Sequence, residues 1–395
     1  MTSSDPACRE PIDTIVVLGS TLTALALVRS VHRLGLKVHV LDTVSGIAMK
    51  SRYPEKTVFQ QGTDSSILNV LKKAGGPNSA LIADSDRWLR FLLRYAVQIN
   101  DIFGKVLHPG VDILALCLDK VEFLSWCRAK GLPAPRLYDA DNLNWQNAED
   151  ILPLIIRPEE TQHSIGTPIP KAVYIETIDE YRGWIAAYKQ ADVRPVVCQS
   201  VLTEDMQQFS VCFARRKSGE TLSMVTEKIR PFAERCRGGS YVMTCDMPKI
   251  QNLGEKAINR LNFHGIGEVE ILHDPKTEKS WLIEINARPW VQFPLAAKKE
   301  FNLLAFLLNR TSSGHNQAEK AWLWFAADFY ECFAAGGLIR QGRLTWKNYL
   351  RSILRSESFA FWDLRDPRPF LNEFGQFMGV LVSSGAKKMT HKRGR

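Results

Sequence analysis

Two alternating runs joined by a turn, within residues 267–289, constrain this chain more than any other feature. Alternation of polar and apolar residues predicts an antiparallel hairpin, because successive side chains of a strand point to opposite faces of the sheet. Glu268 and Glu270 are therefore expected on one face of the first strand. One face of the second strand is expected to carry Glu284, Asn286 and Arg288.

This polar face has the chemistry of a metal and phosphate site. Carboxylate and amide oxygens are hard ligands suited to Mg²⁺, which keeps several waters and accepts phosphate oxygens. Glu270, Glu284 and Asn286 are therefore candidate metal ligands. Arg288 would present a two-pronged guanidinium to a phosphate or a substrate carboxylate. A solvated hairpin face alternates in the same way, so the hairpin alone leaves both interpretations open.

The first forty residues predict a β-α-β unit. A β-rich run at 15–18 precedes apolar residues at helical spacing up to Leu34, and 38–42 indicates the next strand. Gly19 is the one glycine in the turn after the first strand, so the G-x-G-x-x-G fingerprint of dinucleotide sites is missing. The unit therefore favours a Rossmann-like fold, and a nucleotide-dependent oxidoreductase remains only an alternative.

Composition indicates an ordinary globular protein. Of the 395 residues 45% are hydrophobic and 24% are charged, and no apolar run is long enough to cross a membrane. The N-terminus lacks the order of a signal peptide, so a cytoplasmic protein is expected. Five positive charges of the net +9 fall in 387–395, which predicts a disordered basic tail. Without a recognition motif beside that tail, a nucleic-acid ligand is not expected.

Five segments, taken in order, resemble the motifs of the ATP-grasp superfamily across residues 116–308. They are Asp119-Lys120 with the turn at 131–135, the run 153–158, the run 196–202, the basic pair Lys228 and Arg230, and the hairpin 267–289. Each motif is short, but all five stand in the family's order and at sensible spacing. The later sequence, including Asp366-Pro367-Arg368-Pro369, is similar to a bacterial subgroup of carboxylate–amine ligases related to biotin carboxylase.

The resemblance implies a nucleotide site built from several of these motifs. The residues expected at the phosphates are Lys120, Arg157 (where the family usually has lysine), Ser164, Gly166 and Lys228. The residues expected at the adenine hinge are Gln199, Ser200, Val201 and Leu202. Glu204 or Asp205 would accept from the ribose hydroxyls.

The resemblance also implies a catalytic set and its cofactors. Lys228, Arg230 and Arg288 would contact the transferring phosphate or the substrate. The cofactors would be ATP and two Mg²⁺ ions, with Mn²⁺ as a substitute. No general base is evident from the sequence.

The fold expected from pattern and resemblance together is α/β plus α+β. A Rossmann-like pre-ATP-grasp domain at 1–115 would precede an ATP-grasp domain at 116–310, which has antiparallel sheets and a lid at about 152–201. A C-terminal helical extension at 311–386 and the basic tail at 387–395 would follow.

The function implied by the resemblance is an ATP- and Mg-dependent ligase. It would activate a carboxylate as an acyl phosphate and couple it to an amine, forming an amide or peptide-like bond. Small-molecule acids and amines are the expected partners, and the family allows a homodimer. A non-catalytic nucleotide-binding protein with the same fold stays open, because Arg157 and Ser200 depart from the family pattern.

Overall fold

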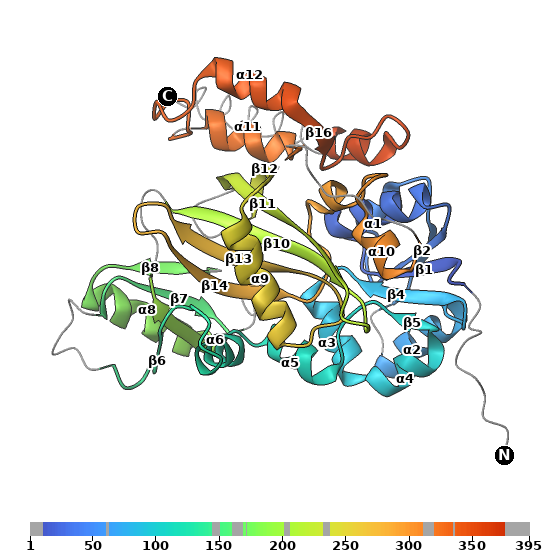
Figure 1. The fold of residues 1–395 in the computed structure, drawn as a ribbon, viewed down its shortest axis with the longest axis horizontal. Helices are drawn as coiled ribbons and strands as arrows, with labels where there is room; N and C mark the ends of the chain where they lie inside the picture. Colours follow the sequence, from blue (N-terminus) through green and yellow to red (C-terminus); the bar gives the residue numbers. More distant parts are fainter. Residues whose placement is uncertain are drawn as a thin grey trace, which may run out of the picture.

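The computed structural model describes most of the chain. The described residues are 11–60, 63–143, 151–159, 169–170, 172–200, 206–231, 238–310, 320–334 and 336–375. Figure 1 shows three sheet-containing parts, with the N-terminal part in blue and the longest strands, in yellow-green to gold, at the centre.

The N-terminal part is a parallel sheet covered by helices. Its strand order is β3-β2-β1-β4-β5, and all of its pairs are parallel. The strands are β1 (Thr14–Leu18), β2 (Lys37–Asp42), β3 (Glu55–Val58), β4 (Ser79–Ala83) and β5 (Lys105–Val106). The helices are α1 (Leu22–Arg33), α2 (Asp64–Ala74), α3 (Asp86–Arg94) and α4 (Ala96–Ile102). The parallel β1–β2 pair confirms the predicted β-α-β opening.

Two helices, α5 (Val111–Leu118) and α6 (Lys120–Ala129), connect this sheet to the rest of the chain. Asp119 separates the two helices. The carboxylate of Asp119 accepts hydrogen bonds from the backbone N–H groups of Val121 and Glu122 at 2.9 and 3.0 Å. Asp119 is therefore the N-cap of α6 and places Lys120 at the start of that helix.

The central sheet has seven strands in the order β14-β13-β10-β11-β12-β15-β16. Its long antiparallel strands are β10 (Gln207–Arg215), β11 (Thr221–Pro231), β12 (Gly239–Cys245), β13 (Gly265–Asp274) and β14 (Lys279–Asn286). Helix α9 (Pro248–Arg260) lies across it in Figure 1. Apolar side chains of β10, β13 and α9 form a core together with those of α5 and α6, which joins the connecting helices to the sheet. The short α10 (Leu303–Leu307) packs against the sheet's other core.

A smaller sheet of four strands lies beside the central one. Its order is β6-β9-β7-β8, with all pairs antiparallel. The elements are β6 (Leu137–Tyr138), β7 (Leu154–Pro158), β8 (Val173–Ile175), α8 (Ile178–Gln190) and β9 (Pro195–Gln199). Thr177 and Glu180 form a capping box that starts α8. This unit corresponds in sequence to the predicted lid.

The segment expected to be a helical extension is not purely helical. It contains α11 (Phe325–Phe333) and α12 (Trp346–Arg355), but also β15 (Ala321–Leu323) and β16 (Ser356–Phe359), which complete the central sheet. Trp322 was expected in a helix. It lies instead in β15, where it is fully buried and opposite Val242 of β12. Tertiary pairing and burial therefore decide the conformation of this apolar run.

The C-terminal segment also closes onto the first helix. Arg29 of α1 donates to Asp366 Oδ2 at 3.1 Å, and to the carbonyl oxygens of Phe361 and Asp366 at 2.8 and 2.9 Å. Arg29 and Asp366 are both buried. In the described part of the chain, no helix is long and apolar enough to cross a membrane.

Candidate active site

A cleft of about 380 Å³ lies between the central sheet, the small sheet and the start of α3 and α6. Strands β13 and β14 supply part of its wall, and β7 and β9 supply another part. The cleft brings together most of the described residues that were predicted for the site. Those that line it are Lys120, Arg157, Gln199, Lys228, Glu270, Glu284, Asn286 and Arg288.

The register of the β13–β14 hairpin places the predicted metal ligands on one face. Glu268 lies opposite Asn286, and Glu270 lies opposite Glu284. Residues directly opposite each other in an antiparallel pair share a face, so four oxygen-bearing side chains project together. All four line the cleft. The expected shared face is therefore confirmed.

Lys228 of β11 reaches the same face. Its Nζ donates to Glu270 Oε2 at 3.0 Å, and Gln208 Nε2 donates to that oxygen at 3.0 Å. Burial opposes ionisation of Glu270, but the Lys228 ammonium outweighs it, so the pKa of Glu270 is lowered. Burial and the charge of Glu270 raise the pKa of Glu268 to about 7. Glu270 is thus the more acidic member of this pair, and a proton taken up by the pair resides on Glu268.

Arg288 is held by a residue that the sequence did not single out. Its Nε donates to Asp86 Oδ1 at 2.6 Å, and one terminal nitrogen donates to Asn286 Oδ1 at 3.2 Å. Asp86 stands in the first turn of α3, directly after the buried strand β4 and the loop that follows it. Acidic residues are common in the first turn of a helix, so only the three-dimensional contact with Arg288 reveals the role of Asp86.

Lys120 and Arg157 approach the cleft from the opposite side. Lys120 Nζ donates to the Glu159 carbonyl oxygen at 3.1 Å, and burial lowers its pKa. Arg157 lies 3.6 Å from Glu284 Oε2, and its buried Nε has no hydrogen-bond partner among the described residues. The Arg157 guanidinium is therefore close enough to the Glu284 carboxylate to be attracted by its negative charge.

The described part of the predicted adenine hinge is β9 and the residue after it. Gln199 is exposed and lines the cleft, whereas Ser200 is buried and does not. The Ser200 N–H donates to the Pro153 carbonyl oxygen at 2.9 Å, so this donor is already used within the protein. The predicted contacts Ser164, Gly166, Val201, Leu202, Glu204 and Asp205 lie outside the described residues.

Arg230 was expected beside Lys228 but is not brought to the cleft. A bulge in the β11–β12 pairing places Lys228 opposite Val242 and Arg230 opposite Tyr241. Neighbouring residues of β12 face opposite sides, so the bulge turns Arg230 to the other face of the sheet. There it forms a two-pronged ion pair with Asp328 at 2.7 and 2.8 Å and stacks over Tyr241. This arginine has a structural contact instead of a catalytic one.

The oxygen ligands on the hairpin fit Mg²⁺. Glu270, Glu284 and Asn286 offer two carboxylates and one amide, whereas Mg²⁺ takes one or two carboxylates and completes its shell with water and phosphate. Among the described residues, no group of three or more His, Cys, Asp and Glu side chains forms a self-sufficient metal site. Two carboxylates and one amide would leave positions in the shell of Mg²⁺ for water and phosphate oxygens.

The comparison with solved structures identifies the fold. The biotin carboxylase domain dimer of the Hydrogenobacter thermophilus 2-oxoglutarate carboxylase, in complex with MgADP, ADP and bicarbonate, matches 78% of this chain and 71% of its own. The TM-score is 0.61 at 13% identity. N5-carboxyaminoimidazole ribonucleotide synthetase from Thermotoga maritima matches 76% of this chain and 77% of its own, with a TM-score of 0.58 at 15% identity. The chain has the ATP-grasp fold that these enzymes share.

One curated relative is similar in sequence. The carbamoyl phosphate synthase large chain of Pyrococcus furiosus is 24% identical over 306 residues, which are 75% of this chain. The matched region covers only 27% of that relative's length. No model of a known protein family matches the sequence.

Proposed function

We propose that this protein is an ATP- and Mg-dependent ligase that activates a carboxylate as an acyl phosphate and couples it to an amine. The proposal rests on the cleft in which Glu270 and Glu284 lie opposite each other. The same cleft is lined by Lys120, Arg157, Lys228 and Arg288. The likeness in fold to the N5-carboxyaminoimidazole ribonucleotide synthetase of Thermotoga maritima, and to a biotin carboxylase domain solved with MgADP and bicarbonate, supports the proposal.

The first step transfers a phosphoryl group. A carboxylate oxygen attacks the γ-phosphorus, the bond to the β,γ-bridging oxygen breaks, and ADP leaves with that electron pair. Charge builds on the transferring oxygens, so fixed cations around them lower the barrier. We assign Lys120, Arg157 and Lys228 to the phosphates, and Arg288 to the phosphate or the acid. When bound through Glu270, Glu284 and Asn286, Mg²⁺ would supply further neutralisation at the β- and γ-phosphates.

The second step forms the product bond. The amine nitrogen attacks the acyl carbon, phosphate leaves with the former carboxylate oxygen, and the nitrogen loses a proton. No group among the described residues is assigned as the base for that proton. Water must be kept from the acyl phosphate, and we assign this to the segment 152–201 acting as a lid.

The ion pairs within the cleft have a consequence for nucleotide binding. Lys228 is paired with Glu270 and Arg157 lies near Glu284. Each cation is therefore partly neutralised before ATP binds. Divalent cations on the two carboxylates would release Lys228 and Arg157 toward the phosphates, which explains how a cleft with balanced charges could hold a polyanion.

We retain the predicted domain division as part of the proposal, with one change. Residues 1–115 form the pre-ATP-grasp unit and 116–310 the ATP-grasp unit, but β15 and β16 belong to the central sheet and so extend the second unit. The adenine hinge at 199–202, the ribose acceptors at 204–205 and a homodimer also remain proposals.

The decisive experiment is a screen of ¹⁸O-labelled carboxylates, each with a set of amines and Mg-ATP, that measures ADP release and label in the phosphate. An acyl phosphate route places one ¹⁸O atom from the acid in the released phosphate. ADP formed without label transfer would exclude acid activation. If Mg-ATP raises the melting temperature but no pair releases ADP, the non-catalytic alternative gains instead.

A further inference from the structure

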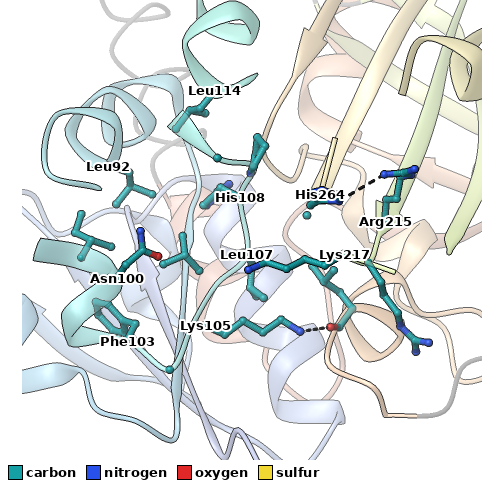
Figure 2. Close-up of a pocket in the computed structure, with 18 of the residues that line it drawn as sticks. Leu92, Asn100, Phe103, Lys105, Leu107, His108, Leu114, Arg215, Lys217 and His264 are labelled. Carbon is teal, nitrogen blue, oxygen red and sulfur yellow. Dashed lines mark hydrogen bonds between the residues drawn. The ribbon is translucent and has the colours of Figure 1, made fainter. Parts of the chain in front are cut away.

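A second cavity, of about 1000 Å³, lies at the edge of the N-terminal sheet. Its walls come from α3, α4, β5 and α5 on one side, and from the β10–β11 turn and the start of β13 on the other. It shares no lining residue with the cleft described above. Figure 2 shows this cavity.

The strand register separates the two sites. Arg215, which lines the second cavity, is paired with Gly265, and Phe213 is paired with Gly267. Glu268 and Glu270 occupy the alternate positions of β13 and therefore face the other side of the sheet. The second cavity is thus a distinct feature and not an extension of the cleft.

One wall of the cavity carries an excess of positive charge. Its cationic groups are Lys105, Arg215, Arg216 and Lys217, with His264 beside Arg215. Figure 2 shows Lys105, Lys217, Arg215 and His264 gathered on one side. Glu220 is the sole carboxylate among the described lining residues, and it is bound to Arg216 at 2.9 Å. Four basic side chains therefore line this wall together with one carboxylate.

Two of these cations have only neutral acceptors within the described part of the chain. Arg215 is buried and donates to Asn262 Oδ1 at 3.2 Å and to the Phe263 carbonyl oxygen at 3.1 Å. Lys105 Nζ has a neutral acceptor, the Leu307 carbonyl oxygen at 2.5 Å. Burial, and then the charges of Arg216 and Lys217, lower the pKa of Lys105. A buried cation without a counter-charge is costly, and an anion in the cavity would offset that cost.

The opposite wall is apolar. Leu92, Ile99, Phe103, Leu107 and Leu114 line it but are nearly fully buried, whereas Leu93, Ala96, Val106 and Val111 also line the cavity and keep part of their surface exposed. Figure 2 shows Leu92, Phe103 and Leu114 facing the basic side across the cavity. Concave sites with an apolar lining and a few polar groups at one end are typical of small-molecule binding sites.

We propose that this cavity binds a small amphiphilic anion, with its apolar body against the leucine-rich wall and a terminal carboxylate or phosphate at Lys105, Arg215 and Lys217. The ligand would bind whether or not the chain is a ligase, because the cavity is separate from the proposed catalytic cleft.

The test measures binding of octyl phosphate and octanoate to the full-length protein by calorimetry. We expect one site per chain, with binding tighter than that of inorganic phosphate by at least about tenfold, since the octyl tail buries apolar surface that inorganic phosphate lacks. Octylammonium, which has the same tail and the opposite charge, is not expected to bind there. Stronger binding of octyl phosphate than of octanoate would assign the terminal group as phosphate, and the reverse as carboxylate.

Two variants locate the site. Lys105→Met and Lys217→Glu should each weaken binding of the preferred octyl anion at least about tenfold, because each removes or reverses a charge at the cavity. Lys72→Glu, on an exposed position of α2 outside the cavity, is the matched control and should bind like the wild type. Lys217 is exposed, so its variant should fold even if Lys105→Met does not.

Several results would overturn the proposal. These are no binding of either octyl anion, equal binding of octylammonium, wild-type affinity in Lys217→Glu, and displacement of the octyl anion by Mg-ATP. The last would place the probe in the cleft. Equal affinity for inorganic phosphate and octyl phosphate would also contradict the proposal, because the apolar wall would then contribute nothing.

Discussion

Arg288 Nε lies 2.6 Å from Asp86 Oδ1, although the two residues are 202 positions apart in the chain. Burial disfavours charge at Asp86, but Arg288 outweighs that effect and the pKa of Asp86 is lowered. The carboxylate is thus a fixed negative partner that orients the guanidinium across the boundary between the N-terminal part and the β13–β14 hairpin. In the proposed reaction Asp86 is a positioning residue.

Replacing Asp86 by Asn should keep the fold but release Arg288 from its charged partner. Small errors in the placement of a catalytic group can cost about 100-fold in rate, so we expect ADP release to fall roughly 10- to 100-fold. Steady-state kinetics should show the loss in kcat more than in the KM for ATP, and Asp86→Glu should restore part of it. Asp179→Asn, at an exposed position of α8, is the control. Unchanged kcat in Asp86→Asn would refute the positioning role.

Glu284→Gln should bind nucleotide poorly in the presence of Mg²⁺ and lose turnover. The substitution removes a proposed metal ligand and the negative charge near Arg157. Loss of one electrostatic contact to a transition state costs about 100- to 1000-fold in kcat, and we expect a loss of that order. Thermal unfolding should stay close to wild type, since the side chain is 28% exposed. Glu278→Gln, in the turn of the same hairpin, should remain active; if both variants behave alike, the metal assignment is wrong.

Arg230→Met should lower stability instead of altering phosphate contacts. Its partner Asp328 is fully buried, and removal of one member of a buried ion pair costs roughly 3–5 kcal/mol. Urea unfolding of Arg230→Met and of Arg230→Met/Asp328→Leu would separate the loss of the ion pair from the cost of leaving the Asp328 charge buried and unpaired. The double variant leaves no charge behind and should recover much of the lost stability. A folded Arg230→Met protein with impaired ATP binding at wild-type stability would instead return Arg230 to the catalytic set.

The stability of the protein should depend on pH through His108. Its Nδ1 donates to the Ala287 carbonyl oxygen at 2.8 Å and its Nε2 accepts from the Ala83 N–H at 2.7 Å, an arrangement that needs the neutral ring. Burial lowers the pKa of His108 to about 4. The unfolded chain takes up this proton near pH 6.5 and the folded chain only near pH 4, so His108 lowers the free energy of unfolding as the pH falls through this window.

The measurement for His108 compares urea unfolding of the wild type and His108→Gln from pH 8 to pH 4. We expect the variant to be less stable at pH 8, because two buried hydrogen bonds are disturbed. The difference should shrink as the pH drops from about 6.5 toward 4, since only the wild type carries the His108 penalty. A difference that is constant over this range would show that His108 is not held neutral.

The alternation of residues along the hairpin was enough to predict much of the site, because the two-residue period of a strand is unambiguous over a short hairpin. Alternation alone placed Glu268, Glu270, Glu284 and Asn286 on one face, and the observed pairing agrees. The family resemblance placed both Lys228 and Arg230 at the site, but a register shift between them in β11 turns Arg230 to the other face of the sheet. A bulge depends on the partner strand, which a single sequence does not specify.

Contacts between distant segments were beyond sequence reasoning for a related reason. In the sequence, Asp86 looks like any acidic residue in the first turn of a helix. Its role follows only from the contact with Arg288. Trp322 lies in an apolar run that suits a helix or a strand, and its pairing with β12 decides between them. The basic cavity likewise joins β5 to the β10–β11 turn, more than 100 residues away in the chain.

The buried pair of Arg29 and Asp366 has a consequence for any attempt to shorten the protein. A fragment that stopped before residue 360 would leave the buried guanidinium of Arg29, on helix α1, without its carboxylate and without the Phe361 carbonyl. The N-terminal unit would then be damaged by a cut at the far end of the chain. Expression of the first 310 residues as a minimal enzyme should therefore give an insoluble or loosely packed product, even though every proposed catalytic side chain would still be present.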